Sequence, residues 1–369
     1  MLTWKRFRTQ ECDRNGDDRG THQVETSTVT LDDVARVSGV SRAAASRALN
    51  GREGVRDDVR ERVRHVADSL GYRPNRAARN LASGRTSVIG LIMPSDELRV
   101  DPYGASLVQA VADAADRHDE GLMLHLAKTE PRRAVGDMMR DGLIDGVIVS
   151  AIALGSRWVD ELLDANMPTI LIGGHTERFD VHTVEVENAT STGTLVEHLH
   201  QEGCRRIAHI RGRHGRVDAD QREAGYRAAL DRCGLRFDPD LVVDGDFSRH
   251  TARRITPDLL EHRPDAIVAA NDETAIGALK AIEAAGLRVP DDIALVGFDG
   301  TAAIDVVDPT LTTARQPFDR MGELAVSSLI RLIAGDDVPL QQVVPPAIEL
   351  AASSQRTGGA DTPPHVKTE

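Results

Sequence analysis

Residues 29–50 read VTLDDVARVSGVSRAAASRALN and predict two short helices joined by a tight turn. The first helix begins with a capping box, because Thr30 can accept a backbone N–H and an acidic residue follows three positions later. Gly39 ends this helix, and Ser41 caps the start of the second one. Residues 59–70 carry apolar side chains at helical spacing and predict a third helix. Three short helices around such a turn indicate an all-α helix-turn-helix head.

Two segments flank this head. Residues 1–27 are polar and aperiodic, which is typical of a disordered extension. Residues 75–84 contain good helix formers but span only about two turns, and isolated helices that short are marginal in water. They predict a linker that becomes helical only when a partner supports it.

From Ser87 onward, short buried strands alternate with amphipathic helices, which predicts an α/β body with two doubly wound lobes of parallel strands. A last helix at Phe318–Ala334 and a strand at Val343–Leu350 are expected to return to the first lobe. The predicted organisation is a disordered extension at 1–27, a helix-turn-helix domain at 28–74, a hinge at 75–86, a first lobe at 87–187 completed by 316–350, a second lobe at 188–315 and a flexible tail at 351–369.

The charge of the chain is divided unevenly. Its net charge of −13 argues at first against nucleic acid, yet residues 28–86 hold twelve arginines and seven acidic residues, a balance of +5. Residues 87–369 carry −18. A basic head on an acidic body is expected where one module alone meets phosphates, so the charge distribution is compatible with DNA binding.

Several features favour a cytoplasmic protein. Cys12, Cys204 and Cys233 are odd in number and widely spaced, which gives no disulfide framework and suits a reducing compartment. No apolar run is long enough for a membrane span, and the N-terminus lacks the apolar region of a signal peptide.

A set of motifs, in order along the chain, resembles the LacI/GalR repressor family. They are residues 29–35, 39–41 and 46–50 in the head, 72–75 after it, and 222–226, 270–272, 291–299 and 311–313 in the body. The resemblance covers roughly residues 29–350 and implies a body of the periplasmic-binding-protein type. It also implies a DNA-binding repressor, cytoplasmic and associated with the nucleoid, whose binding to operator DNA responds to a small-molecule effector, with a sugar or sugar derivative as the default. We expect a homodimer on a near-palindromic operator, without a cofactor.

The resemblance also implies which residues meet DNA. Arg42 and Ala43 fall where the family's main base-reading pair sits, and Arg42 could bind guanine O6 and N7 with two hydrogen bonds. Arg47 matches a further base-reading arginine. Residues suited to phosphate contacts are Ser41, Ser46, Asn50 and Tyr72. In the hinge, Asn75, Ala78 and Leu81 match the family's minor-groove helix, in which a leucine wedges into the central base step.

By the same resemblance, Arg222 and Asp299 face the cleft between the lobes, where the arginine would donate to ligand hydroxyls and the carboxylate would accept from them. Asn271 can do both, and Tyr103 and Phe247 match aromatic walls. Effector binding is then expected to act on the hinge through residues 83–86.

Other classes of protein fit less well. A metal site at His198, His200 and Cys204 is disfavoured because residues two apart on a helix diverge. Neither a phosphate-binding GxxxxGK[ST] loop nor a GxSxG nucleophile elbow occurs, so we do not expect an enzyme. A periplasmic-type sugar-binding protein without a DNA role, and a purine-responsive corepressed regulator, remain the alternatives.

Overall fold

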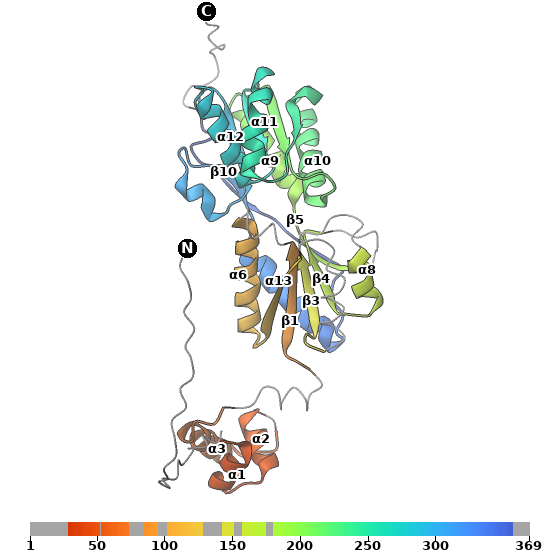
Figure 1. Ribbon diagram of the computed structural model, residues 1–369, viewed down its shortest axis with the longest axis vertical. Coiled ribbons are helices and arrows are strands. Elements are labelled where there is room, and N and C mark those ends of the chain that lie inside the picture. The colour runs from red at the N-terminus through yellow and green to blue at the C-terminus, as the bar shows by residue number, and fades with distance from the viewer. Residues whose placement is uncertain are drawn as a thin grey trace, which may run out of the picture. The chain divides into compact units, whose positions relative to one another are not determined.

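The computed structural model describes residues 29–51, 53–73, 85–94, 102–127, 142–150, 157–174 and 180–356. The contacts divide the chain into two units, residues 1–82 and 83–369 (Figure 1). The predicted extension at 1–27 and the predicted linker helix at 75–84 lie outside the described residues. Among the described helices, none combines the length and the apolar character that crossing a bilayer requires.

The first unit contains the three predicted helices, α1 at Leu31–Ser38, α2 at Arg42–Leu49 and α3 at Asp57–Ser69. The capping box of α1 is confirmed: Asp33 N donates to Thr30 Oγ1 over 3.3 Å, and Thr30 N donates to Asp33 Oδ2 over 3.1 Å. Gly39 ends α1 with a φ of 67°, a left-handed conformation that suits glycine.

The core of the head is built from small side chains. Its fully enclosed members are Val34, Ala35, Ala45, Ala48, Val63 and Ala67. Four of these six are alanines, and larger side chains that are partly exposed, among them Leu31, Leu49 and Leu70, pack around them.

The first lobe is a parallel sheet with helices on both faces. Its elements are β1 at Val88–Pro94, α6 at Pro102–Arg117, β2 at Gly121–Ala127, β3 at Gly146–Ser150, α8 at Arg157–Asp164, β4 at Thr169–Ile172, β5 at His182–Val186, α13 at Phe318–Ala334 and β11 at Gln341–Val344. The strand order is β11-β5-β4-β3-β1-β2. Alternate side chains of the central strands pack against α6 and α13 on one face and against α8 on the other.

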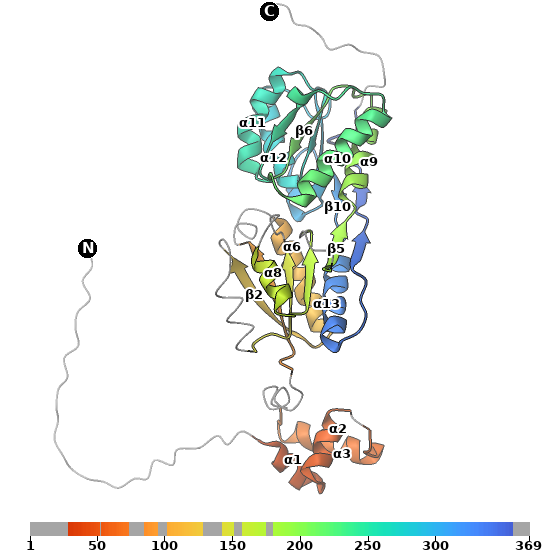
Figure 2. The ribbon, with the colours of Figure 1, turned by 90° about the vertical axis from the view of Figure 1, so that its right-hand side faces the viewer.

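The second lobe repeats this architecture. Its elements are α9 at Asn188–Gln201, β6 at Ile207–Arg211, α10 at Val217–Arg232, β7 at Val242–Asp244, α11 at Arg249–Glu261, β8 at Ala266–Ala269, α12 at Asp272–Ala284, β9 at Ala294–Asp299, β10 at Thr312–Arg315 and β12 at Ala347–Glu349, with short 3-10 turns at Pro239–Leu241 and Ala302–Val306. The strand order is β12-β10-β9-β8-β6-β7 (Figure 2). The pairing of β12 with β10 is antiparallel, and the other pairs are parallel.

The end of the chain differs from the prediction. The strand expected at Val343–Leu350 is two strands, β11 in the first lobe and β12 in the second. Pro345 and Pro346 lie between them and cannot donate ladder hydrogen bonds, so the strand cannot continue. The flexible tail expected from residue 351 is also wrong for residues 351–356: Ser353 is fully buried, and its carbonyl accepts from Leu295 N over 2.8 Å.

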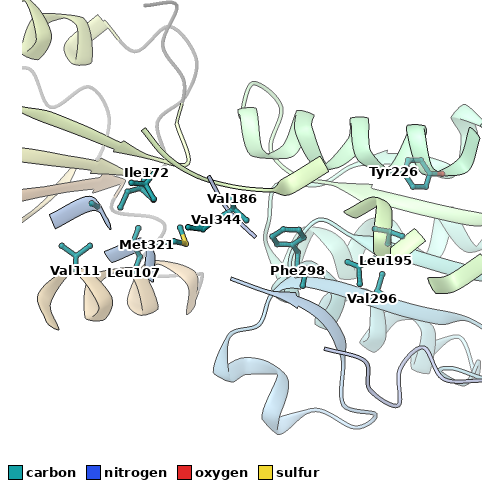
Figure 3. Packing of buried hydrophobic residues seen from close by; sticks show 14 of the residues in the cluster. Leu107, Val111, Ile172, Val186, Leu195, Tyr226, Val296, Phe298, Met321 and Val344 are labelled. Atoms are coloured by element: carbon teal, nitrogen blue, oxygen red, sulfur yellow. The ribbon is translucent and has the colours of Figure 1, made fainter. Parts of the chain in front are cut away.

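Within residues 180–356 the chain passes between the lobes three times, after β5, after β10 and after β11. One hydrophobic cluster runs through these crossings from the first lobe to the second. Figure 3 shows Met321, Val344 and Val186 at the crossing and Phe298 on the side of the second lobe. The lobes are therefore joined by packed side chains as well as by the chain itself.

Candidate functional site

The start of α2 is exposed, as a base-reading helix requires. The Ser41 side chain accepts from Ala44 N over 3.2 Å and caps the helix. Arg42, Ala43 and Arg47 are exposed on its surface, and the Arg42 side chain keeps 70% of its accessible area. Because Ala45 and Ala48 point into the head, the arginines occupy the outer side of the helix.

The residues predicted to contact phosphates are partly engaged within the head. Asn50 Nδ2 donates to the Ser46 carbonyl over 2.9 Å and to the Ser46 hydroxyl over 3.3 Å. Tyr72 is half-buried and packs against the core of the head. Asn75, Ala78 and Leu81 lie outside the described residues.

Arg222 is the centre of a buried polar network in the second lobe. It lies on α10, and its side chain is 5% exposed. Its Nε donates to Asn188 Oδ1 over 2.9 Å, its Nη1 donates to the Ala270 carbonyl, and its Nη2 lies 3.4 Å from Asp299 Oδ1. The guanidinium carbon is 3.7 Å from the centre of the Phe298 ring, so an aromatic face supports the cation. Every edge of the guanidinium is thus held in place.

Asp299 is the last residue of β9, where it closes the carboxyl end of the strand. Burial raises the pKa of its carboxyl to about 7, against the opposing effect of the Arg222 charge, and Asp272 raises it further. Gln316 Nε2 donates to Asp299 Oδ1 over 2.6 Å. The φ of Asp299 is 104°, which is rare outside glycine and marks a position held by its surroundings. This carboxyl therefore keeps its proton to a higher pH than an exposed aspartate does.

Phe247 forms a wall beside this network. Its ring packs on Gly212 so closely that a Cβ there would lie 2.1 Å from the ring. The guanidinium carbons of Arg216 and Arg222 are 5.7 Å and 6.0 Å from the ring centre. Asn271 fixes the backbone of Phe247, since Asn271 Nδ2 donates to the Phe247 carbonyl over 3.2 Å. The φ of Phe247, 69°, is also left-handed.

The structure brings together four of the five predicted effector residues: Arg222 and Asp299 touch, Arg222 faces Phe247, and Phe247 is held by Asn271. Tyr103 belongs to the first lobe, where its ring meets Phe318 edge-on at 5.4 Å. Phe318 follows Gln316 by two residues, at the crossing from β10 to α13. This crossing therefore contacts Asp299 of the second lobe and Tyr103 of the first.

Sequence reasoning assigned no role to Asn188, Arg216, Asp218 or Gln316. Arg216 and Asp218 form a nearly buried pair, with Nη2 and Oδ2 2.9 Å apart. Burial alone would raise the pKa of Asp218, but the charges of Arg216 and Arg222 hold it below its usual value. Arg216 lies at the end of the loop after β6 and Asp218 in the first turn of α10, and this position beyond the carboxyl end of a parallel strand is the one available signal.

The side chains considered for a metal site face different partners. His198 Nε2 lies 2.8 Å from Ser354 Oγ, and His200 Nδ1 lies 3.2 Å from Arg205 Nη1. Cys204 is buried, and burial raises the pKa of its thiol to about 11.

Two family models match the chain. The helix-turn-helix model "Bacterial regulatory proteins, lacI family" covers residues 30–75, and "Periplasmic binding protein-like domain" covers residues 196–352.

Two similar proteins are transcriptional regulators, and this chain aligns with almost their whole length. The HTH-type transcriptional regulator CelR of Thermobifida fusca is 31% identical over 315 residues, which cover 83% of this chain and 92% of the relative. The HTH-type transcriptional repressor PurR of Erwinia tasmaniensis is 32% identical over 328 residues, which cover 87% and 95%.

Two similar solved structures are also transcriptional regulators. A lac repressor dimer bound to operator and the anti-inducer ONPF is 28% identical with a TM-score of 0.75 and covers 89% of this chain and 99% of its own. A CelR–cellobiose complex is 29% identical with a TM-score of 0.68 and covers 88% of this chain and 99% of its own. The chain therefore belongs to the LacI family of bacterial regulatory proteins and joins the helix-turn-helix head of that family to a periplasmic-binding-protein-like body.

Proposed function

We propose that this protein represses transcription by binding operator DNA through its head, and that a small molecule held by the body controls this binding. The observation that carries the proposal is the exposed outer side of α2 in a head that matches the LacI family model. Arg42, Ala43 and Arg47 read bases, while Ser41, Ser46, Asn50 and Tyr72 position the head on phosphates. Asn75, Ala78 and Leu81 enter the minor groove.

The operator is near-palindromic, and the protein binds it as a homodimer, in line with the lac repressor dimer bound to operator. We place this activity in the cytoplasm, at the nucleoid. The test is selection from a randomised duplex library by the full-length chain. We expect a near-palindromic consensus, and Arg42→Ala should change the preferred base at one position in each half-site. A chain that enriches no sequence would contradict the proposal.

The effector binds at the carboxyl ends of the second-lobe strands, against Arg222, Phe247, Asn271 and Asp299, with Tyr103 on the side of the first lobe. The supporting observation is the left-handed backbone of both Phe247 and Asp299 beside a fully engaged arginine. A carboxyl that can donate or accept, an amide and a guanidinium suit neighbouring hydroxyls, so a sugar or sugar derivative is the first candidate. A bound purine is the second, because a PurR protein is among the relatives.

Effector binding acts on the hinge through the crossings between the lobes. The crossing from β10 to α13 supports this step, because Gln316 contacts Asp299 there and Phe318 contacts Tyr103. A ligand that displaces Gln316 from Asp299 would favour one lobe arrangement over the other. A thermal-shift screen of sugars and nucleosides identifies the class. We expect a sugar to raise the melting temperature of the wild type and to leave that of Asp299→Ala unchanged.

A further inference from the structure

Arg42 has a partner on the neighbouring helix. Its Nε lies 3.4 Å from Oδ1 of Asp32, the second residue of α1, and both side chains are about 70% exposed, at 70% and 69%. The ion pair therefore lies on the surface of the head at the start of α2 and links α1 to α2. Asp32 takes no part in the capping box of α1, which uses Asp33.

The edge of the guanidinium that Asp32 contacts determines which N–H groups of Arg42 stay available to bind DNA. An arginine presents its five N–H groups along a planar fork, and two parallel N–H groups are needed to bind guanine O6 and N7 together. The closest approach of Asp32 is to Nε, and among the described residues no hydrogen bond engages the terminal nitrogens of Arg42. The pair thus leaves the end of the fork free and restrains its rotation.

Asp32 also carries a charge that DNA phosphates repel. An acidic residue beside the base-reading helix weakens binding to every duplex, and counterion release makes this effect general rather than sequence-dependent. The ion pair is weak in water because both groups are solvated, but it strengthens when the DNA interface excludes water. Asp32 therefore has two effects. Its charge lowers the affinity for every duplex, and its ion pair with Arg42 offsets part of that loss on a duplex that presents guanine to Arg42.

We propose that Asp32 is a positioning residue for base recognition: it fixes the Arg42 guanidinium end-on for guanine and lowers affinity for non-operator DNA. This inference rests on the proposed function, since it requires that α2 enters the major groove.

The chain contains a matched control. Asp58 is the second residue of α3, as Asp32 is of α1, and it pairs with an exposed arginine, Arg56, at 3.3 Å. Replacing either aspartate with alanine removes one negative charge from the first turn of a helix and one surface ion pair. The two variants therefore share any loss of helix-dipole stabilisation, and they differ in their contact with Arg42.

The experiment measures binding of the full-length chain to the duplex selected from the randomised library, to the same duplex with the Arg42-dependent guanine changed to adenine, and to a duplex of unrelated sequence. The proteins are wild type, Arg42→Ala, Asp32→Ala, Asp32→Asn and Asp58→Ala. We expect wild type to prefer guanine by roughly tenfold or more and Arg42→Ala to lose that preference. Asp32→Ala should lower the preference by about threefold or more and bind the unrelated duplex more tightly. Asp58→Ala should keep the wild-type preference.

Asp32→Asn removes the negative charge of this side chain and keeps its size and shape. Because the contact with Arg42 is an ion pair, we expect Asp32→Asn to lower the guanine preference as Asp32→Ala does and to share the tighter binding to unrelated DNA. The inference is overturned if Asp32→Ala and Asp58→Ala retain the same guanine preference, or if Arg42→Ala retains that of the wild type. Failure of the wild type to select any duplex would instead contradict the proposed function itself.

Discussion

Arg42 in the head and Arg222 in the second lobe are held in opposite ways. The Arg42 side chain is 70% exposed with one carboxylate beside it, whereas the Arg222 side chain is 5% exposed and has a partner on each edge. An exposed arginine keeps much of its rotational freedom, which a single neighbouring carboxylate restricts only in part, and a buried one gives up that freedom when the chain folds. The exposed arginine of the head is thus available to a large partner. The buried arginine of the second lobe is part of a fixed polar network.

The largest effect should come from removing the buried arginine. Arg222→Ala leaves Asp299 buried without its cation and removes the donor to the Ala270 carbonyl, which should lower the free energy of unfolding by roughly 3 kcal/mol. Chemical denaturation measures this loss. The matched control is Arg232→Ala, whose exposed pair with Glu197 should contribute less than about 1 kcal/mol. Equal losses in both variants would show that the network around Arg222 is no more fixed than a surface pair.

A second effect concerns pH. Burial raises the pKa of Asp299 to about 7 from an ordinary value of 3.8, so the folded chain keeps a proton that the unfolded chain loses. This group alone makes the free energy of unfolding fall as pH rises from about 4 to about 7. Buried His209, whose Nδ1 lies 2.9 Å from the Val268 carbonyl, acts oppositely. Burial lowers its pKa from 6.5 to about 4, so its contribution is lost as pH falls through that range.

The two opposing groups should partly cancel in the wild type. Asp299→Asn removes one of them, and we expect its free energy of unfolding to rise more steeply between about pH 5 and about pH 7.5 than that of the wild type. Denaturant titrations at both pH values provide the test, with Asp58→Asn as an exposed control that should follow the wild type. An Asp299→Asn curve parallel to the wild type would mean that Asp299 is already ionised at pH 5.

The smallest effect belongs to the head. Thr30→Ala removes the capping box of α1 and should cost about 1 kcal/mol of local stability. In a head whose core is mostly alanine, this loss should increase hydrogen exchange of the amides in residues 31–38 of the full-length chain. Exchange rates in α13, which has no side-chain cap, serve as the internal reference. Unchanged exchange in α1 would show that the small core alone holds the helix.

The same contrast explains how much the sequence predicts. The helices of the head follow from local rules, because Thr30, Ser41 and Gly39 act on residues at most five positions away. Strands β5 and β10 were not predicted, because β5 includes His182, Thr183 and Glu185 and β10 reads TTAR, so neither shows an apolar run. Their strand conformation depends on neighbours in the sheet. The contact of Gln316 with Asp299 was also missed, because it requires both the crossing after β10 and the left-handed backbone at Asp299.

The family resemblance gave the positions of Arg222, Phe247, Asn271 and Asp299, and the structure adds how they are connected. Asn271 caps α12 by accepting from Thr274 N over 2.9 Å and also holds the Phe247 carbonyl. Spacing along the chain cannot reveal this double role, since it depends on how the loop after β7 returns over the start of α12.

The most direct test of the link between the two regions is the affinity of the full-length chain for its selected duplex, measured with and without the sugar found in the thermal-shift screen, in the wild type and in Asp299→Ala. We predict that the sugar changes the wild-type Kd by about fivefold to about 150-fold. Asp299→Ala should bind the duplex with the wild-type Kd and show no change on addition of the sugar. An Asp299→Ala variant that responds to the sugar as the wild type does would contradict the account.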